Sequence, residues 1–123
     1  MRIIKTEKAP AALGSYSQAI LMNNIFFSSM QLGINAASGE LASGFEAQCR
    51  TILLNLTEIL NAGEMSMGEV VKVSVYLKDL DNFNIFNSIY SEYFTEPYPA
   101  REIVEVSALP KAAELGISIT AMK

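Results

Sequence analysis

Apolar residues recur along the chain with two different spacings, which separate the helical segments from the strands. In the first helical segment they return every three or four residues, at Phe45, Cys49, Ile52, Leu53, Leu56, Ile59 and Leu60. This spacing predicts an amphipathic helix of about five turns. Ser43-Gly-Phe-Glu46 matches a capping box at its start, and Gly63 is expected to end it. Cys49 lies on the apolar stripe, so a buried core thiol is predicted rather than a nucleophile.

The segment Val70–Leu77 alternates instead, with Val71, Val73, Val75 and Leu77 in one row and Lys72, Ser74 and Tyr76 in the other. Such alternation predicts a half-buried strand. Strands are also predicted at four further β-favouring runs: Arg2–Thr6, Ser15–Met22, Ile25–Ser29 and Gly116–Met122. Asn23-Asn24 is expected to form a two-residue hairpin turn, because asparagine tolerates positive φ.

A second helix is predicted after a polar turn that contains the candidate caps Asp79 and Asp81. Its apolar stripe consists of Phe83, Phe86, Tyr90 and Phe94. Pro97 and Pro99 stop this helix, since proline does not allow it to continue. After Arg101, the β-branched run Ile103, Val104 and Val106 predicts one more strand.

The order ββ-β-α-β-α-β-β suggests an α+β fold in a single domain, residues 1–123, with one mixed sheet and both helices packed on one face. Half of the residues are apolar, and the mean hydropathy is +0.25. This surplus predicts a homo-oligomer in which the bare face of the sheet meets a sister subunit. No stretch approaches the ~20 apolar residues of a membrane span, and Met1–Lys5 lacks a signal-peptide core, so no membrane association is expected.

Charge and residue types argue against several classes of function. The formal net charge is −4, from 9 Lys and Arg against 13 Asp and Glu, which opposes binding to nucleic acid. The only cysteine, Cys49, allows no intramolecular disulfide and fits a reducing cytoplasm. There is no histidine, which removes Ser-His-Asp and Cys-His catalysis and imidazole metal sites. With no metal-ligand cluster and no glycine-rich phosphate loop, we expect neither a metal nor a cofactor.

Arg101 is the strongest candidate for function among the individual residues. Pro97 and Pro99 hold the backbone extended before it, and a strand follows. A guanidinium on such a stiff approach can present two parallel N–H donors to a carboxylate. The alternative interpretation is an ordinary edge-strand arginine that reaches into water. Glu102 and Glu105 are not expected to act as a carboxylate pair, because strand alternation sends them to opposite faces.

Several short motifs follow one another in a specific order. The chain contains Gly14-Ser-Tyr-Ser-Gln-Ala19 near its start, and Pro99-Ala-Arg101 with Leu109-Pro-Lys111 near its end. Between them lie Ser29, Gln31, Ser38-Gly-Glu-Leu41, Phe45-Glu-Ala-Gln48, Asn55-Leu56, Val70-Val-Lys-Val73, Leu77, Asp81, Phe83, Asn87 and Tyr90. In this order the motifs resemble the reactive-intermediate deaminase family, RidA, also called YjgF. The resemblance covers the chain from about Gly14 to Lys111.

The resemblance implies a chorismate-mutase-like homotrimer, with sheets lining a central barrel and ligand clefts between subunits. It also implies hydrolysis of reactive enamines and imines, such as 2-aminoacrylate released by pyridoxal-phosphate enzymes, to 2-oxo acids and ammonia. Arg101 would hold the substrate carboxylate and Tyr16 would line the cleft, as the catalytic pair. The implied substrate-binding residues are Arg101, Ser29, Met30, Asn87, Ile103 and Ser118.

The chain departs from the family pattern at three positions. Ser15 replaces a proline, Met30 replaces a glycine, and the glutamate of the family's last strand is missing. Counting without gaps from Arg101 places Gly116 at the glutamate position, and a shift of two residues places Ser118 there. A serine hydroxyl can orient a water but is a poor base, so we expect a slower deaminase or one with a different substrate.

Two other functions stay open beside the deaminase. The first is a binding or regulatory member of the same family, in which Arg101 anchors a small carboxylate metabolite without turnover. The second is RNA cleavage or translation inhibition, which has been attached to some relatives. The negative charge and the lack of histidine argue against this second function.

Overall fold

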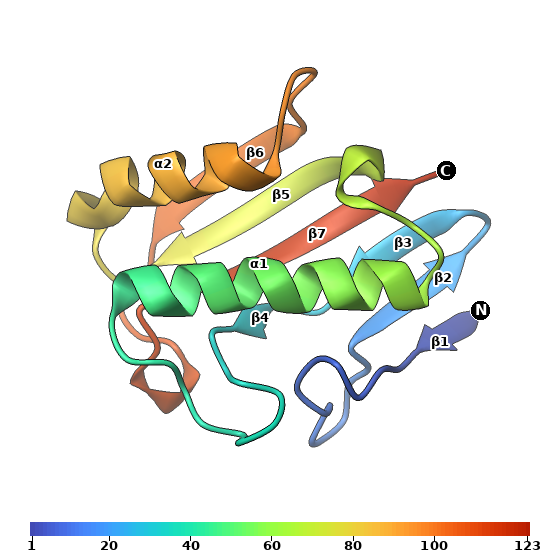
Figure 1. The fold of residues 1–123 in the computed structure, drawn as a ribbon, viewed down its shortest axis with the longest axis horizontal. Coiled ribbons are helices and arrows are strands. Elements are labelled where there is room, and N and C mark those ends of the chain that lie inside the picture. Colours follow the sequence, from blue (N-terminus) through green and yellow to red (C-terminus); the bar gives the residue numbers. More distant parts are fainter.

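Seven strands form one mixed sheet, and two α-helices cover one of its faces (Figure 1). The computed structural model describes residues 1–123. The strands are β1 (Arg2–Ile4), β2 (Ala19–Met22), β3 (Ile25–Ser28), β4 (Gln31–Leu32), β5 (Val70–Leu77), β6 (Ala100–Glu105) and β7 (Leu115–Met122), and the helices are α1 (Phe45–Ala62) and α2 (Phe83–Tyr93). The predicted α+β class, with both helices on the same face, is confirmed.

The sheet runs in the order β1-β2-β3-β7-β5-β6, and β4 pairs with β7 beyond the end of β3. Every neighbouring pair is antiparallel except β5 and β6, which are parallel and joined through α2. Strand β6 is therefore an edge strand, and α2 returns the chain to its start. Strand β4 is absent from the predicted order, because two residues are too few to show an alternation.

The β2–β3 hairpin forms as predicted, with Asn23 at φ 50° and Asn24 at φ 64°. Both asparagines thus adopt the left-handed conformation that a tight two-residue turn requires. The strand predicted from Ser15 begins only at Ala19. Residues 15–17 form a loop instead, because their hydroxyl-rich side chains lie outside the sheet ladder.

The predicted capping box at the start of α1 is wrong. The helix begins at Phe45 and its N-cap is Gly44, at φ 90°, so Ser43 does not cap it. Glu46 accepts a hydrogen bond from Arg50 Nε at 3.3 Å instead of reaching back to the cap. At the second helix, Asp79 accepts from the Asp81 N–H at 2.9 Å, as expected of a cap, but it caps a short 3₁₀ turn that leads directly into α2.

Strand β5 differs from the predicted alternation at its first two residues. The pairing with β7 shifts between Val70 and Lys72, so one extra residue is accommodated there. Such a β-bulge changes which side chains face inward. Val70 is consequently buried and Val71 is exposed, so Val71 does not share a face with Val73 and the later members of its predicted row, which are buried.

The core lies between the sheet and the two helices. Its fully buried aliphatic side chains come mainly from α1, β5 and β7: Ile52, Leu53, Leu56, Ile59, Leu60, Val73, Leu77, Leu115 and Ile117. Cys49 is part of the same cluster and has no exposed surface. Burial raises the pKa of the Cys49 thiol to about 12. The predicted core thiol is confirmed.

The face of the sheet away from the helices is not covered by any element of the chain (Figure 1). Phe27, Val104 and Met122 are exposed. Strand pairing places these three side chains on the uncovered face, because their neighbours Phe26, Ile103 and Ala121 face the core. We refer to this surface as the open face. Neither helix has the length and apolar content that a bilayer crossing needs.

The Cys49 thiol should resist alkylation by iodoacetamide at pH 8 in the folded protein and react fully after unfolding in urea. Burial excludes the reagent, and the protonated thiol is a poor nucleophile. Because folding raises the pKa from 9.0 to about 12, the contribution of this group to stability is complete below pH 9 and is lost between pH 9 and 12. Mass spectrometry measures the labelling, and rapid stoichiometric reaction of the folded protein would contradict the assignment.

Candidate active site

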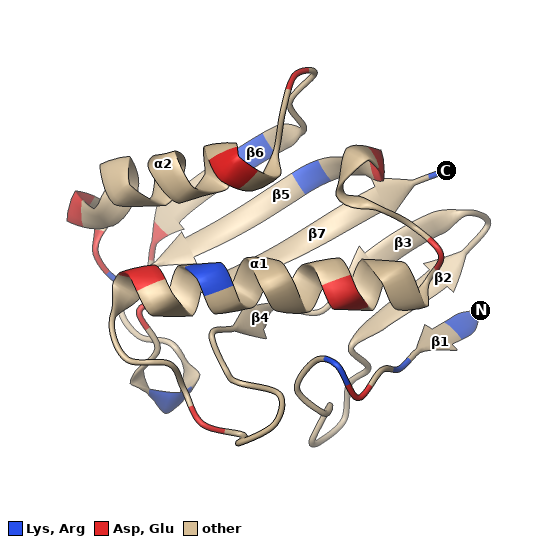
Figure 2. Ribbon diagram, viewed as in Figure 1, with Lys and Arg blue, Asp and Glu red and all other residues tan.

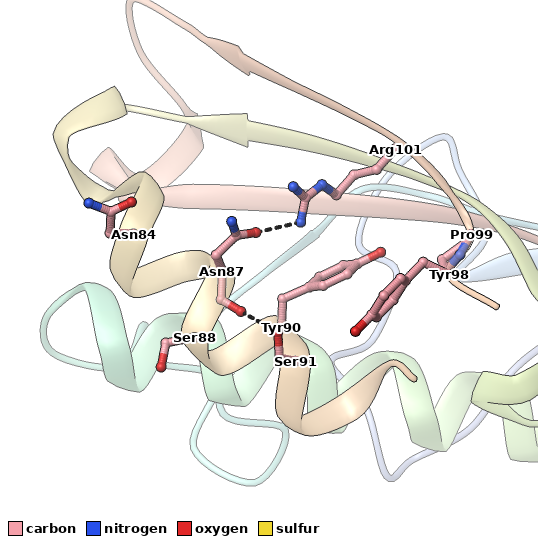
Figure 3. A pocket seen from close by; sticks show the side chains of 8 residues that line it. All are labelled: Asn84, Asn87, Ser88, Tyr90, Ser91, Tyr98, Pro99 and Arg101. Carbon is pink, nitrogen blue, oxygen red and sulfur yellow. Dashed lines mark hydrogen bonds between the residues drawn. The ribbon is translucent and has the colours of Figure 1, made fainter. Parts of the chain in front are cut away.

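Arg101 lies in β6 with its side chain on the helix-covered side of the sheet. In the parallel pair of β5 and β6 it stands opposite Val73, whose side chain is buried beneath the helices. Its Nη1 donates to Asn87 Oδ1 at 2.7 Å (Figure 3). Its Cζ lies 4.8 Å from the centroid of the Tyr90 ring. Helix α2 therefore holds the half-buried guanidinium by a hydrogen bond and a cation–π contact.

No carboxylate of the chain pairs with Arg101. The ion pairs of the structure involve other cations: Arg2, Arg50 and Lys72. Removing a cation from water is costly unless an opposite charge or several hydrogen bonds compensate for it. The Asn87 oxygen and the Tyr90 ring compensate in part, and the remaining guanidinium N–H groups are available to an anion.

A cavity of about 630 Å³ opens beside Arg101, and we call it the arginine cavity. It is lined by Asn84, Asn87, Ser88, Tyr90, Ser91, Tyr98, Pro99 and Arg101 (Figure 3). Only two of these eight residues are hydrophobic. A cation surrounded by amide and hydroxyl groups is an arrangement that can bind a small carboxylate.

Tyr16, Ser29 and Met30 line a different cavity, of about 680 Å³, which we call the tyrosine cavity. It shares no lining residue with the arginine cavity. Eight of its fifteen lining residues are hydrophobic, among them Leu32 and Ile34. The tyrosine cavity thus has a large apolar wall with Lys111 in its lining, whereas the arginine cavity is mainly polar.

Hydrogen bonds from polar side chains fasten the loop that carries Tyr16. Ser29 Oγ donates to the Ser17 carbonyl at 2.6 Å, and Gln18 Nε2 donates to the Pro10 carbonyl at 2.8 Å. Gln18 is itself buried, so its amide needs these backbone partners. The hydroxyl of Ser29 accordingly positions the Tyr16 loop, and its proton is engaged within the chain.

One chain does not bring all the predicted site residues together. Ile103 lies on the same side of β6 as Arg101 and packs against the core. Ser118 stands opposite Ser74 of β5, in the row that faces away from the helices. Neither lines the arginine cavity or the tyrosine cavity. Within one chain the predicted residues are therefore divided: Arg101 and Asn87 line one cavity, Tyr16, Ser29 and Met30 line the other, and Ile103 and Ser118 line neither.

Of the residues that line the arginine cavity, only Arg101 and Asn87 were predicted from the sequence as site residues. Tyr90 and Tyr98 contribute aromatic walls, and α2 contributes a polar stripe formed by Asn84, Asn87, Ser88 and Ser91. This stripe recurs every three or four residues, so the helical period could have revealed it beside the apolar stripe of the same helix. Tyr98 carries no such signal, because it lies in the loop between α2 and β6.

Charges are interspersed over the whole molecule. Figure 2 shows Lys and Arg at separate places on the ribbon, with Asp and Glu between them. The structure contains no group of three or more cysteine and carboxylate side chains that could hold a metal ion. The groups available for binding or catalysis at the candidate site are therefore the guanidinium, side-chain amides, hydroxyls and backbone groups.

Comparisons with known proteins agree with one another. The family model described as Endoribonuclease L-PSP matches residues 6–123. The chain is 42% identical to a human protein named 2-iminobutanoate/2-iminopropanoate deaminase, over 99% of this chain and 90% of the human one. It matches the crystal structure of RidA from an Antarctic Psychrobacter bacterium at a TM-score of 0.98 with 40% identity, covering 100% of both chains. The chain belongs to the RidA (YjgF) family.

A further RidA-type structure, Escherichia coli TdcF with bound serine, matches at a TM-score of 0.95 with 33% identity. The alignment covers 100% of this chain and 99% of that one. The family resemblance inferred from the motifs is thereby confirmed over the whole chain.

Met30, which was expected to replace a family glycine, lies against Gly116, one of the two positions considered for the missing glutamate. A Cβ atom on Gly116 would lie 2.6 Å from Met30 Sδ and 2.9 Å from Met30 Cγ. Real side chains do not approach so closely, so the thioether of Met30 occupies the space into which any side chain at position 116 would extend. The methionine and the glycine are therefore complementary, and neither departure is independent of the other.

Gly116→Ala should destabilise the protein by roughly 1 kcal/mol, because the added methyl group forces the flexible Met30 side chain out of its preferred rotamer. In a Met30→Ala background the same substitution should cost much less, since the thioether is gone. Urea unfolding of the four proteins at one protein concentration measures the coupling. Gly68→Ala is the matched control, because a Cβ there meets only Ser66 Oγ at 3.7 Å. Additive effects, within about 0.5 kcal/mol, would contradict the complementarity.

Proposed function

We propose that this protein hydrolyses 2-imino acids and their enamine tautomers, such as 2-aminoacrylate, to 2-oxo acids and ammonia. The observation that carries the proposal is Arg101, a half-buried cation without a carboxylate partner beside a polar cavity. The 42% identity to the human 2-iminobutanoate/2-iminopropanoate deaminase supports the reaction type. The bound serine of the TdcF structure, an α-amino acid, supports a small carboxylate ligand.

Arg101 binds the substrate carboxylate through its free N–H groups, in two parallel hydrogen bonds. Asn87 holds the guanidinium from one side at 2.7 Å, and the Tyr90 ring supports it from another. A guanidinium that is already oriented loses little freedom when the substrate binds, so the carboxylate is placed with little further entropic cost.

The reaction needs neither a strong nucleophile nor a histidine. 2-Aminoacrylate first takes a proton at its methylene carbon, which gives the protonated imine (iminium) of pyruvate. Its positively charged nitrogen makes the adjacent carbon electrophilic, and a water oxygen adds to that carbon as a water proton passes to the nitrogen. The resulting carbinolamine loses ammonia as the C=O bond forms, which leaves pyruvate. Holding the substrate and limiting bulk solvent around it are the tasks of the protein.

The proposal includes a homotrimer in which the open faces of the sheets meet. Phe27, Val104 and Met122 are exposed there, and burying them between copies would remove apolar surface from water. Such an assembly, expected for the family from its motifs, would set the arginine cavity of one subunit against the tyrosine cavity of the next. Tyr16, Ser29 and Met30 would then complete the site around Arg101.

A second candidate function is binding of a small carboxylate without turnover. The specific observation in its favour is Gly116, which stands where the family pattern counted from Arg101 has glutamate, with Met30 over it. The cleft would then lack a carboxylate to place the attacking water. Retained turnover therefore requires that hydroxyl or backbone groups orient this water.

The proposed reaction belongs to the cytoplasm, and it involves no nucleic acid. The only cysteine is buried and forms no disulfide, in keeping with a reducing compartment. The net charge of −4 opposes binding to phosphates.

Arg101→Ala should lower kcat/KM for 2-aminoacrylate by roughly 30-fold to several thousand-fold, as expected for the loss of one partner of a desolvated arginine–carboxylate pair. Arg101→Lys should retain part of the activity, because it keeps the positive charge. It should not restore full activity, because an ammonium group cannot donate two parallel hydrogen bonds to the carboxylate. The assay generates 2-aminoacrylate in situ and records 2-oxo acid formation with and without protein.

Arg2→Ala is the matched control, since it removes an exposed arginine that pairs with Glu64 at 3.5 Å, and it should leave the activity unchanged. An Arg101→Ala protein as active as the wild type would refute the proposal. Wild-type protein that binds 2-oxobutyrate in the millimolar range or better, yet does not accelerate 2-oxo acid formation, would establish the binding function instead.

Light scattering should give a mass of roughly three times the 13.4 kDa of the chain. Phe27→Glu, which places a charge on the open face, should lower this mass, because desolvating an unpaired carboxylate opposes association. A wild-type monomer at micromolar concentration would be inconsistent with the proposed interface.

A further inference from the structure

Tyr90 is almost completely buried beneath the arginine cavity. Its exposed fraction is 4%, and its ring stacks on Phe94 with the centroids 4.4 Å apart. Phe86 lies on the same helix face, at 5.5 Å between centroids. Ring packing alone therefore explains why an aromatic side chain occupies this position, and phenylalanine would pack equally well.

The hydroxyl of Tyr90 needs a separate explanation. It is buried and has no hydrogen-bond partner within the chain. Most buried hydroxyls in proteins do have partners, and an unpartnered one lowers stability, so such a group calls for a functional reason. Burial also raises the pKa of the Tyr90 phenol, an effect that Arg101 partly offsets. The hydroxyl consequently keeps its proton at neutral pH and is a donor.

The surroundings of this hydroxyl contain the proposed carboxylate-binding group. Tyr90 and Arg101 line the same cavity, and the guanidinium carbon lies 4.8 Å from the Tyr90 ring centroid. Figure 3 shows the ring beside the guanidinium, with its hydroxyl end directed towards Tyr98 and away from Ser88. The arginine and the tyrosine come from different elements, β6 and α2, and they converge on one space.

We propose that Tyr90 is a substrate-binding residue whose hydroxyl donates a hydrogen bond to the carboxylate held by Arg101. This inference rests on the proposed function and adds a second donor to the same site. Hydrogen bonds to an ionised oxygen are stronger than those between neutral groups. Donors from two rigid elements also determine the orientation of a planar carboxylate, which one guanidinium leaves free to tilt. The ligand class is a small 2-imino or 2-oxo acid.

Tyr90→Phe removes the hydroxyl and keeps the ring, so it tests the role of the hydroxyl alone. The variant should lower kcat/KM for 2-aminoacrylate by roughly 10- to 100-fold, the size expected for a hydrogen bond to a charged group, mainly through KM. Its melting temperature should equal or exceed that of the wild type, because the ring stays and an unpartnered polar group is removed. A residue with only a packing role would leave both kinetic constants unchanged.

Tyr93→Phe is the control, since Tyr93 lies on the same helix, packs against the core and does not line the arginine cavity. Tyr90→Phe activity within about twofold of the wild type, while Arg101→Ala loses turnover, would overturn the inference and leave the proposed function standing.

If the wild type shows no turnover, the proposed reaction fails, and calorimetric titration with 2-oxobutyrate then tests Tyr90 alone. Weaker binding by Tyr90→Phe than by the wild type supports the hydroxyl as a donor to the carboxylate. Equal affinity of the two proteins rejects it.

Discussion

Arg101 carries a half-buried positive charge at the edge of the sheet, with no carboxylate of its own chain beside it. Burying a cation in this way is tolerated only where the surroundings supply compensating groups. Here Asn87 supplies an oxygen and Tyr90 a ring face, both from α2. Because β6 is an edge strand, the guanidinium remains accessible, while the contacts with α2 hold it in place. The position of α2 along β6 thus determines how the guanidinium is held.

Other polar residues of the motifs have structural roles elsewhere in the chain. The Asn55 side chain donates from α1 to the Ile34 carbonyl at 2.9 Å. Gln48 donates to the Ala42 carbonyl at 3.0 Å, and it accepts from the Glu114 N–H at 2.8 Å. Each such bond contributes about 1 kcal/mol, and each would leave a buried amide unsatisfied if it were removed. These residues hold loops in place, whereas the motif residues Asn87, Tyr90, Pro99 and Arg101 line the arginine cavity.

Met30 and Gly116 show how two departures from a family pattern can be one structural change. A glycine in a buried strand normally weakens it, since it adds backbone freedom and packs no side chain. The Met30 thioether fills the space above Gly116 and replaces that packing. An apolar surface results at this position of the sheet.

The sequence by itself determined the two helices, most strands, the Asn23-Asn24 turn and the buried thiol of Cys49, because each depends on local spacing or on one residue type. It also singled out Arg101, whose role stays a prediction. It did not determine the bulge that turns Val71 outward, the glycine N-cap of α1 or the two-residue strand β4, because these depend on pairing between distant segments. Only the tertiary structure decided that Tyr90 lies under Arg101, that Met30 covers Gly116 and that Tyr16 and Arg101 line separate cavities. Such contacts join residues from different elements, so no periodic pattern in the sequence predicts which of them come into contact.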